Sequence, residues 1–149
     1  TNLYGIGDNF HPQDSHVLPA LLRKFHEAKI SNSPTVEIWG TGNPKREFLY
    51  VDDLADALIF LMNNYNGTSH INVGTGVDIP IREVIIMIAN IVGYEGSVIW
   101  NTSYPDGVYE RRLDVTEING LGWKAKVNLL EGLTKTYDWF LKNYNYIRK

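Results

Sequence analysis

Short apolar runs that end in a Gly-Thr-Gly turn alternate along the chain with helical stripes, and this alternation constrains the fold most strongly. Val36-Glu-Ile-Trp39 runs into Gly40-Thr-Gly42, and His70-Ile-Asn-Val73 runs into Gly74-Thr-Gly76. β-Branched and aromatic residues favour strands, and the glycines favour turns. The pattern predicts an α/β fold, although the strands are too short and the loops too long for a regular doubly wound sheet. We expect one compact domain over residues 1–149.

The first expected helix, residues 15–29, shows how its boundaries are assigned. Its apolar stripe runs from Leu18 to Phe25 at positions that share one helical face. Ser15 is the expected N-cap, because a serine hydroxyl can accept a hydrogen bond from a free N–H group of the first turn. His26 falls off the stripe, so we expect its ring to face solvent.

The other elements follow from the same rules. Asp52 or Asp53 is expected to cap the second helix, and Asn128-Leu-Leu-Glu131 is a capping box that opens the last one. Residues 101–112 form a polar loop rich in turn residues. The expected helices, about four in number, cover roughly 15–29, 53–64, 81–92 and 128–144, and the expected strands cover 36–39, 48–51, 70–73 and 97–100.

The composition argues against several classes of function. A net charge of −3 argues against a nucleic-acid-binding surface. The absence of cysteine excludes disulfides and thiolate metal sites, and it leads us to expect a reducing compartment, the cytoplasm. The longest apolar runs, 58–62 and 84–89, are far shorter than the roughly 20 residues of a membrane span. The chain opens on Thr1 without a signal-peptide pattern and reads as a sequence entered midway.

The glycine pairs do not predict a dinucleotide site. Gly5-Ile-Gly7, Gly40-Thr-Gly42 and Gly74-Thr-Gly76 each begin a G-x-G pattern, but the glycine expected three positions later is missing in all of them. Turn chemistry explains the three pairs. The sequence also has no Tyr-x-x-x-Lys motif.

Three of the four histidines lie between residues 11 and 26. His16 falls at a helix start, where the helix dipole disfavours a protonated ring, so it could exchange protons near neutral pH or simply help to cap the helix. His11 is expected in a loop. The spacing of His11, His16 and His26 matches no known metal site, so no metal is expected.

Three further side chains could hold an anionic ligand. Lys24 lies eight residues after His16, which places it ~12 Å farther along the helix axis. Arg46 follows a Gly/Pro turn and can contact phosphate through two nitrogens at once, while Trp39 offers an aromatic surface for a sugar or a base. Each has a structural alternative: a solvated lysine, an arginine paired with Glu47 or a neighbouring carboxylate, and a tryptophan in the core.

The loop from Tyr104 to Arg112 concentrates turn residues, acidic residues and two arginines. Such a loop is suited to fold over an anionic ligand as a flap. A plain surface turn accounts for the same composition equally well.

Several stretches, read together, resemble the GDP-L-fucose synthases, a branch of the extended short-chain dehydrogenase/reductases. Arg46-Glu-Phe-Leu-Tyr-Val-Asp-Asp53 is shared across that superfamily, whereas the combination of Asn9-Phe-His-Pro12, Ser15-His-Val17 and Trp39-Gly-Thr-Gly42 is specific to the branch. The likeness covers nearly the whole chain, but it is a likeness to the C-terminal half of the family. The other matching stretches are Asn2-Leu-Tyr-Gly5, His70-Ile-Asn-Val-Gly-Thr-Gly76 and Pro105-Asp-Gly107.

The resemblance implies a C-terminal substrate-binding lobe whose N-terminal dinucleotide-binding, or Rossmann, half is missing. The implied activity is an NADPH-dependent 3,5-epimerase and 4-reductase that converts GDP-4-keto-6-deoxymannose into GDP-L-fucose. NADP(H) would be held mostly by the missing half, so the isolated chain is expected to be inactive. A Rossmann-half partner or a homodimer is implied as its assembly.

The same resemblance assigns roles to individual residues. His16 would be an acid/base of the epimerisation and would also lie against the nicotinamide, together with Thr1, Asn2 and Leu3. The GDP-sugar would be held by Lys24, Trp39, Arg46, Asp106 and Arg111.

Some positions depart from the family pattern, and two other functions stay open. Tyr104 replaces a frequent lysine, and Glu110 places a negative charge where a positive one is usual, which weakens the expected grip on a diphosphate. Lys24 stands where an arginine is also common, so a bidentate contact is lost. The alternatives are a lobe of another nucleotide-sugar epimerase or reductase, and a non-catalytic binding or interaction module.

Overall fold

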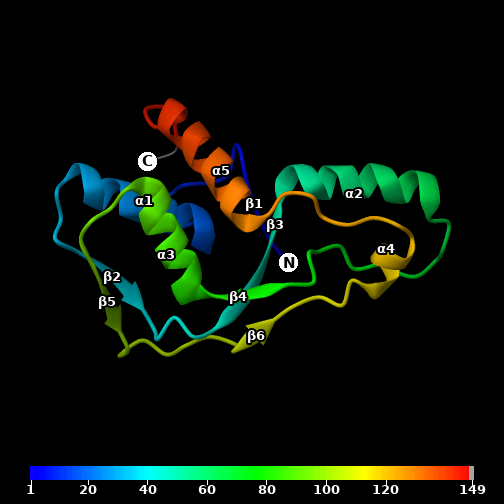
Figure 1. The fold of residues 1–149 in the computed structure, drawn as a ribbon, viewed down its shortest axis with the longest axis horizontal. Helices are drawn as coiled ribbons and strands as arrows, with labels where there is room; N and C mark the ends of the chain where they lie inside the picture. The colour runs from blue at the N-terminus through cyan, green and yellow to red at the C-terminus, as the bar shows by residue number, and fades with distance from the viewer. Residues whose placement is uncertain (148–149) are drawn as a thin grey trace.

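The fold is built around β3 (Lys45–Tyr50), the central strand of the computed structural model, which describes residues 1–147 (Figure 1). The C-terminal half of β3 pairs in parallel with β1 (Asn2–Tyr4). Its N-terminal half pairs antiparallel with β4 (Asp78–Pro80) and parallel with β6 (Glu110–Arg111). One strand therefore joins three segments that lie far apart in the sequence.

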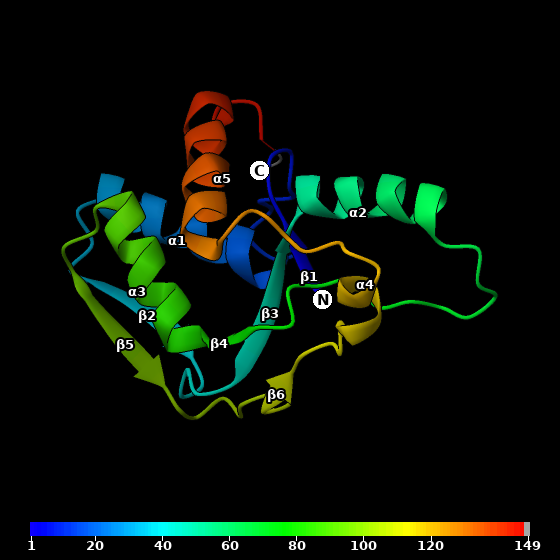
Figure 2. The same ribbon diagram turned by 45° about the vertical axis from the view of Figure 1, so that its right-hand side comes forward.

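A second, two-stranded sheet forms from β2 (Thr35–Trp39) and β5 (Ser97–Asn101), which run in parallel. Parallel strands need a crossover connection, and here the connection includes α3 (Ile81–Val92). Figures 1 and 2 show α3 gathered with α1 (Val17–Ile30) and α5 (Leu129–Asn143) on one side of the molecule. Apolar faces of these helices meet in the main core, which includes Leu22, Phe25, Ile85, Ile88 and Phe140.

A smaller core lies under α2 (Val51–Asn64) and α4 (Thr116–Gly120). Its buried members are Leu49, Ala57, Val115, Ile118 and Trp123.

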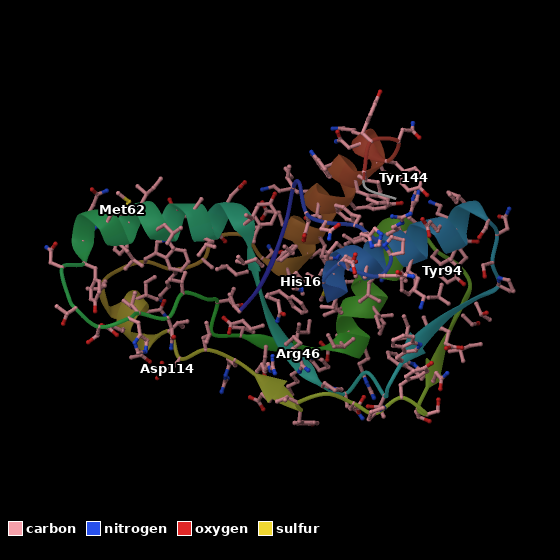
Figure 3. All side chains as sticks on the ribbon, turned by 180° about the vertical axis from the view of Figure 1, so that it is seen from behind. His16, Arg46, Met62, Tyr94, Asp114 and Tyr144 are labelled. Carbon is pink, nitrogen blue, oxygen red and sulfur yellow. The ribbon has the colours of Figure 1, made fainter. Side chains whose placement is uncertain are left out.

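The opposite side of α2 carries large apolar side chains that the described residues leave uncovered. Leu58 is 53% exposed, Ile59 is 63% exposed and Met62 is 83% exposed. Figure 3 shows Met62 near the end of this helix, well away from His16 and Arg46. A helix that is apolar on two faces is typical of one that is packed on both. We call these three residues the outer face of α2.

Buried carboxylates hold the loops on this framework. The Glu47 side chain accepts hydrogen bonds from the backbone N–H groups of Thr75 at 2.6 Å, Gly76 at 2.9 Å and Leu113 at 2.7 Å. A side chain at Gly74 would collide with the same carboxylate. Glu47 therefore fastens the segments next to β4 and β6 against β3.

The Asp53 carboxylate also holds a loop and does not cap α2, and the cap expected for α1 is wrong as well. α2 begins at Val51, and the buried Asp53 carboxylate accepts N–H groups of Lys126 at 3.0 Å and Val127 at 2.9 Å. At α1 the N-cap is His16 rather than Ser15, and the cap has no side-chain hydrogen bond. By contrast, Asn128 caps α5 as predicted, by accepting the Glu131 N–H at 3.0 Å.

Two further expectations about strands and loops are corrected. Residues 70–73 do not form a strand, and the antiparallel partner of β3 is residues 78–80 instead. The loop 101–112 contains β6, which two pairs of residues join to β3. The short helix α4 was not predicted. Its five residues are too few to show a helical stripe.

His26 is buried, contrary to the expectation that it faces solvent. Its Nδ1 lies 3.0 Å from the Tyr137 hydroxyl, and its ring meets those of Phe140 and Tyr144 edge to face. Burial lowers the pKa of His26. The apolar stripe in the sequence of α1 predicted one packed face. In the structure, α5 packs against a second face of α1, which carries His26.

Replacing Glu47 with glutamine should lower the free energy of unfolding by about 2 to 3 kcal/mol, because the amide group offers an N–H where an N–H donor already lies. Urea unfolding followed by circular dichroism measures the change. Glu95→Gln is the matched control, since Glu95 is exposed in the turn after α3. Equal stability of the two variants would show that Glu47 does not hold the loops.

The protein should lose stability as the pH falls below about 6.5, partly through His26. Because the folded-state pKa is lowered, the unfolded chain binds a proton in this range that the native protein does not. The His26→Gln variant should therefore show a smaller loss of unfolding free energy between about pH 7.5 and about pH 5.5. His70→Gln, at an exposed loop position, should keep the wild-type slope. Identical slopes in all three proteins would contradict the assignment.

Candidate functional site

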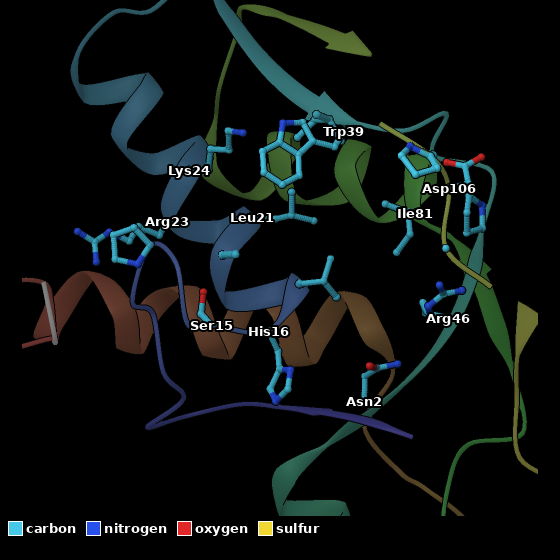
Figure 4. Close-up of a pocket in the computed structure, with 18 of the residues that line it drawn as sticks. Asn2, Ser15, His16, Leu21, Arg23, Lys24, Trp39, Arg46, Ile81 and Asp106 are labelled. Carbon is cyan, nitrogen blue, oxygen red and sulfur yellow. The ribbon is translucent and has the colours of Figure 1, made fainter. Parts of the chain in front are cut away.

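A cleft of about 790 Å³ opens between α1, β2, β3 and the loop that precedes β6 (Figure 4). This volume is within the range of roughly 300 to 1,000 Å³ that is typical of ligand pockets. Many of the predicted site residues line it, and they come from five separate segments. The predicted residues among its walls are Asn2, His16, Lys24, Trp39, Arg46 and Asp106.

His16 lies at one end of the cleft. It is the N-cap of α1, with an extended backbone, and its side chain is exposed. In Figure 4 its ring points away from Lys24, toward the chain that carries β1. The ring also borders a smaller hollow of about 210 Å³, which Leu3 and Asp8 share.

Lys24 and Trp39 mark the other end. The Lys24 ammonium group donates a hydrogen bond to the Glu37 carbonyl at 2.5 Å. Trp39 is 64% exposed, so it is not a core residue, and its ring stacks on Tyr104 with centroids 4.3 Å apart. A cation and a large aromatic surface therefore lie together at the cleft mouth.

Arg46 enters the cleft from β3. Its Nη1 donates to the carbonyls of Lys45 at 2.6 Å and Val108 at 2.7 Å. The alternative pairing with Glu47 is wrong, because that carboxylate is occupied by backbone N–H groups on the other side of the strand. Within residues 1–147, the Nε and Nη2 groups of Arg46 have no hydrogen-bond partner. They remain able to donate to a ligand.

Asp106 fastens the loop to the cleft wall. Its two carboxylate oxygens accept the Thr41 N–H at 2.8 Å and the Thr41 hydroxyl at 2.6 Å. These hydrogen bonds lower the pKa of Asp106. Gly40 has a φ of +81°, and a side chain there would strike the carboxylate, so the glycine turn is required for this contact.

Three of the predicted residues, Thr1, Leu3 and Arg111, do not line the main cleft. Arg111 is exposed in β6, where it is the register partner of Arg46. The Thr1 hydroxyl donates to the Glu47 carbonyl at 3.2 Å, as does the Asn2 amide at 2.9 Å. Leu3 borders the smaller hollow. The structure thus gathers Lys24, Trp39, Arg46 and Asp106 with His16, but not Arg111.

Sequence reasoning missed two residues. Asp8 borders the hollow beside His16, and Tyr104 stacks behind Trp39. Asp8 directly precedes the Asn-Phe-His-Pro stretch, and that adjacency was the available signal. Tyr104 was noticed only as a replacement for lysine, because stacking across 65 residues leaves no local pattern.

The histidines do not form a metal site. His11 lies in the loop before α1, where its Nδ1 accepts the N–H groups of Gln13 and Asp14, whereas His26 is buried. Nowhere in residues 1–147 do three His, Asp or Glu side chains gather as a metal site would require. Over the same range, no helix is long and apolar enough to cross a membrane.

Residues 1–74 match the profile described as the NAD dependent epimerase/dehydratase family. The fold agrees with this match, since the chain has the architecture of the C-terminal, substrate-binding lobe of the extended short-chain dehydrogenase/reductases. The first 74 residues, just under half of the chain, therefore carry the sequence pattern of this family.

Within the family, the chain is similar to GDP-L-fucose synthases. It is 52% identical to GDP-L-fucose synthase 1 of Arabidopsis thaliana over 143 residues, which are 96% of this chain and 44% of the relative. It is also 52% identical to the Escherichia coli K12 GDP-L-fucose synthase, with 99% of this chain and 49% of the relative covered.

A solved GDP-L-fucose synthetase of Naegleria fowleri, bound to NADP, superposes with a TM-score of 0.94 at 30% identity. The superposition covers 100% of this chain and 47% of that one. The chain therefore spans about half the length of the relatives it matches.

Proposed function

We propose that residues 1–149 are the single substrate-binding domain of an NADPH-dependent epimerase and reductase that converts GDP-4-keto-6-deoxymannose into GDP-L-fucose. The observation that carries the proposal is the arrangement of His16, Lys24, Trp39 and Arg46 around one cleft. The similarity to GDP-L-fucose synthases supports the choice of nucleotide sugar. The proposal keeps the cytoplasmic location expected from the cysteine-free sequence.

The chemistry assigns His16 to the sugar end of the ligand. Protons on the carbons beside a ketone are acidic enough for a positioned acid/base group to exchange them. An exposed imidazole at the start of a 14-residue helix, at the edge of the cleft, is placed for that exchange. NADPH, when bound, supplies the hydride that reduces the same ketone.

We assign Arg46 and Lys24 to the diphosphate of the ligand. Trp39 is assigned to the base or to a sugar. The free Nε and Nη2 groups of Arg46 can donate to one phosphate together, as a guanidinium fork does. Lys24 adds a second positive charge, and Asp106 holds the loop beside them through Thr41. Gly107 suits this arrangement, since a side chain there would come within 3.3 Å of Arg46 Nη2.

The cofactor would meet this chain along one edge. Leu3 and His16 are exposed around the smaller hollow and suit contact with a nicotinamide, whereas the Thr1 and Asn2 side chains are already bonded to Glu47. No glycine-rich fingerprint occurs in the sequence, so these residues suit the edge of a dinucleotide and not its diphosphate.

A dinucleotide-binding domain is the partner we propose for the uncovered surfaces. The outer face of α2 is apolar and exposed, and β1 pairs with β3 alone among the described strands. Strands of a parallel sheet are typically buried on both faces by helices. A Rossmann half that extends the sheet from β1 would cover both features, while a homodimer through α2 would cover the helix alone.

Binding of free nucleotides tests the ligand assignment. In isothermal titration, GDP should bind the chain more tightly than UDP or dTDP. Arg46→Lys should weaken GDP binding by roughly tenfold or more, which corresponds to about 1.4 kcal/mol or more for loss of a charge-assisted contact. Arg112→Lys, an exposed change outside the cleft, should leave the affinity unchanged.

Two outcomes of this titration would contradict the proposal. A response to UDP alone would assign the lobe to a different nucleotide-sugar enzyme. No response to any nucleotide, from a folded chain, would favour a non-catalytic interaction module.

Proton exchange tests the role of His16. With the chain joined to a dinucleotide-binding half, the keto-sugar should incorporate solvent deuterium beside its carbonyl, and His16→Gln should reduce the rate by about 100-fold or more, as loss of an acid/base group does. The chain alone should not form product from NADPH. His11→Gln is the control in the neighbouring loop. Undiminished exchange in His16→Gln would refute the assignment.

A further inference from the structure

Two aromatic rings lie against each other at the mouth of the nucleotide-sugar cleft. The rings of Trp39 and Tyr104 stack with an interplanar angle of 13° and centroids 4.3 Å apart. Both side chains are exposed, and within residues 1–147 neither belongs to a core cluster. Large aromatic rings that stay exposed together are typical of a binding surface.

The stack leaves the cleft side of the indole open. Trp39 lines the cleft together with Pro105, whereas Tyr104 is not among the described residues that do. Tyr104 therefore covers a part of the indole that is turned away from the cleft. A planar ligand group that enters the cleft can lie on the other side of the same ring.

The turn at the end of β5 places Tyr104 over Trp39. Asn101 is the register partner of Trp39, so β2 and β5 end at the same level. The Asn101 carbonyl accepts the N–H groups of Gly40 at 2.9 Å and Tyr104 at 3.4 Å. Its side-chain oxygen accepts the Ser103 N–H at 3.1 Å. The chain therefore turns back directly after β5, toward the end of β2.

A second anchor follows two residues after Tyr104. Asp106 accepts both the N–H and the hydroxyl of Thr41, which lies two residues after Trp39. Tyr104 is thus held between two attachment points that both reach the turn following β2. Because the backbone on each side is fixed, the tyrosine ring has little freedom to leave the indole.

The position of Trp39 along the cleft selects the base as its partner. Trp39 and His16 lie at opposite ends of the cleft (Figure 4). The proposed assignments place the hexose at His16 and the diphosphate at the cations. The base is the part of a nucleotide sugar farthest from the hexose, and its flat π-system stacks well on an aromatic ring.

We propose that Tyr104 is a positioning residue that holds the Trp39 indole as the platform for the base of the bound nucleotide. An exposed tryptophan at a strand end has several rotamers available, and it loses that freedom when a ligand binds. A ring stacked on one face removes part of this cost beforehand, while the open face stacks on the base. The inference rests on the proposed function, and it assigns Trp39 to the base and not to a sugar.

The free protein tests the contact itself. In the chain labelled with ¹⁵N, the indole N–H signal of Trp39 is identified by its loss in Trp39→Phe. Tyr104→Ser should shift this signal and make the indole more mobile on the picosecond-to-nanosecond timescale, whereas Tyr104→Phe should keep the wild-type behaviour. Tyr109→Ser is the matched control, since Tyr109 is exposed in the same loop and bonds to Lys45 through its backbone alone.

Titration with GDP tests the function of the contact. Tyr104→Ser should weaken GDP binding by roughly three- to tenfold, the range expected for an aromatic pair, while Tyr104→Phe and Tyr109→Ser should bind as the wild type does. In Trp39→Ala, the same change of Tyr104 should weaken binding no further, because the platform is already absent. In the wild-type complex, an NOE should join the guanine H8 proton to the Trp39 ring.

The outcomes separate this inference from the proposed function. Equal GDP affinity of wild type and Tyr104→Ser, or an unchanged indole signal in that variant, would overturn the positioning role. An NOE from the Trp39 ring to the ribose alone would overturn the assignment to the base. A folded wild-type chain that bound no GDP would refute the proposed function, and the indole signal would still decide whether Tyr104 holds Trp39.

Discussion

The buried carboxylate of Glu47 is the interaction on which the architecture depends. It accepts N–H groups from two loops, at residues 75–76 and at Leu113, and its own carbonyl accepts the side chains at positions 1 and 2. The charge is tolerated in the interior because backbone donors surround it. These contacts hold β4, β6 and β1 on a single strand, β3.

The cleft follows from that arrangement. Successive side chains of a strand point to opposite faces, so Glu47 faces the loops while Arg46 faces the cleft. α1 then supplies His16 at one end and Lys24 about two turns later. The site therefore combines a rigid strand with one face of a helix, while the loop containing Asp106 closes the remaining side through Thr41.

Much of the fold could be predicted where the sequence pattern is long. The helix over 81–92 is confirmed at both ends, the strands 36–39 and 97–100 exist with one added residue each, and the cap of α5 at Asn128 is confirmed. The family resemblance is also confirmed. The strand expected at 70–73 and the solvated His26 were wrong, because each depends on a neighbour from a distant part of the chain.

Within the candidate site, the sequence correctly indicated the chemical types of the side chains, but it did not indicate what surrounds them. A histidine, a lysine and an arginine were singled out, and the structure gathers them in one cleft, while their roles stay predictions. The sequence could not indicate that Asp8 shares a hollow with His16, or that Tyr104 stacks against Trp39.

The amino-acid sequence by itself determined the helical stripes, the turn glycines and the resemblance to a family, since each of these is encoded within a short stretch of neighbouring residues. Tertiary structure alone decided which polar groups are buried and which cations remain free to donate. The physical reason is that burial and hydrogen-bond satisfaction depend on segments brought together by folding, as Glu47 and Leu113 are across 66 positions.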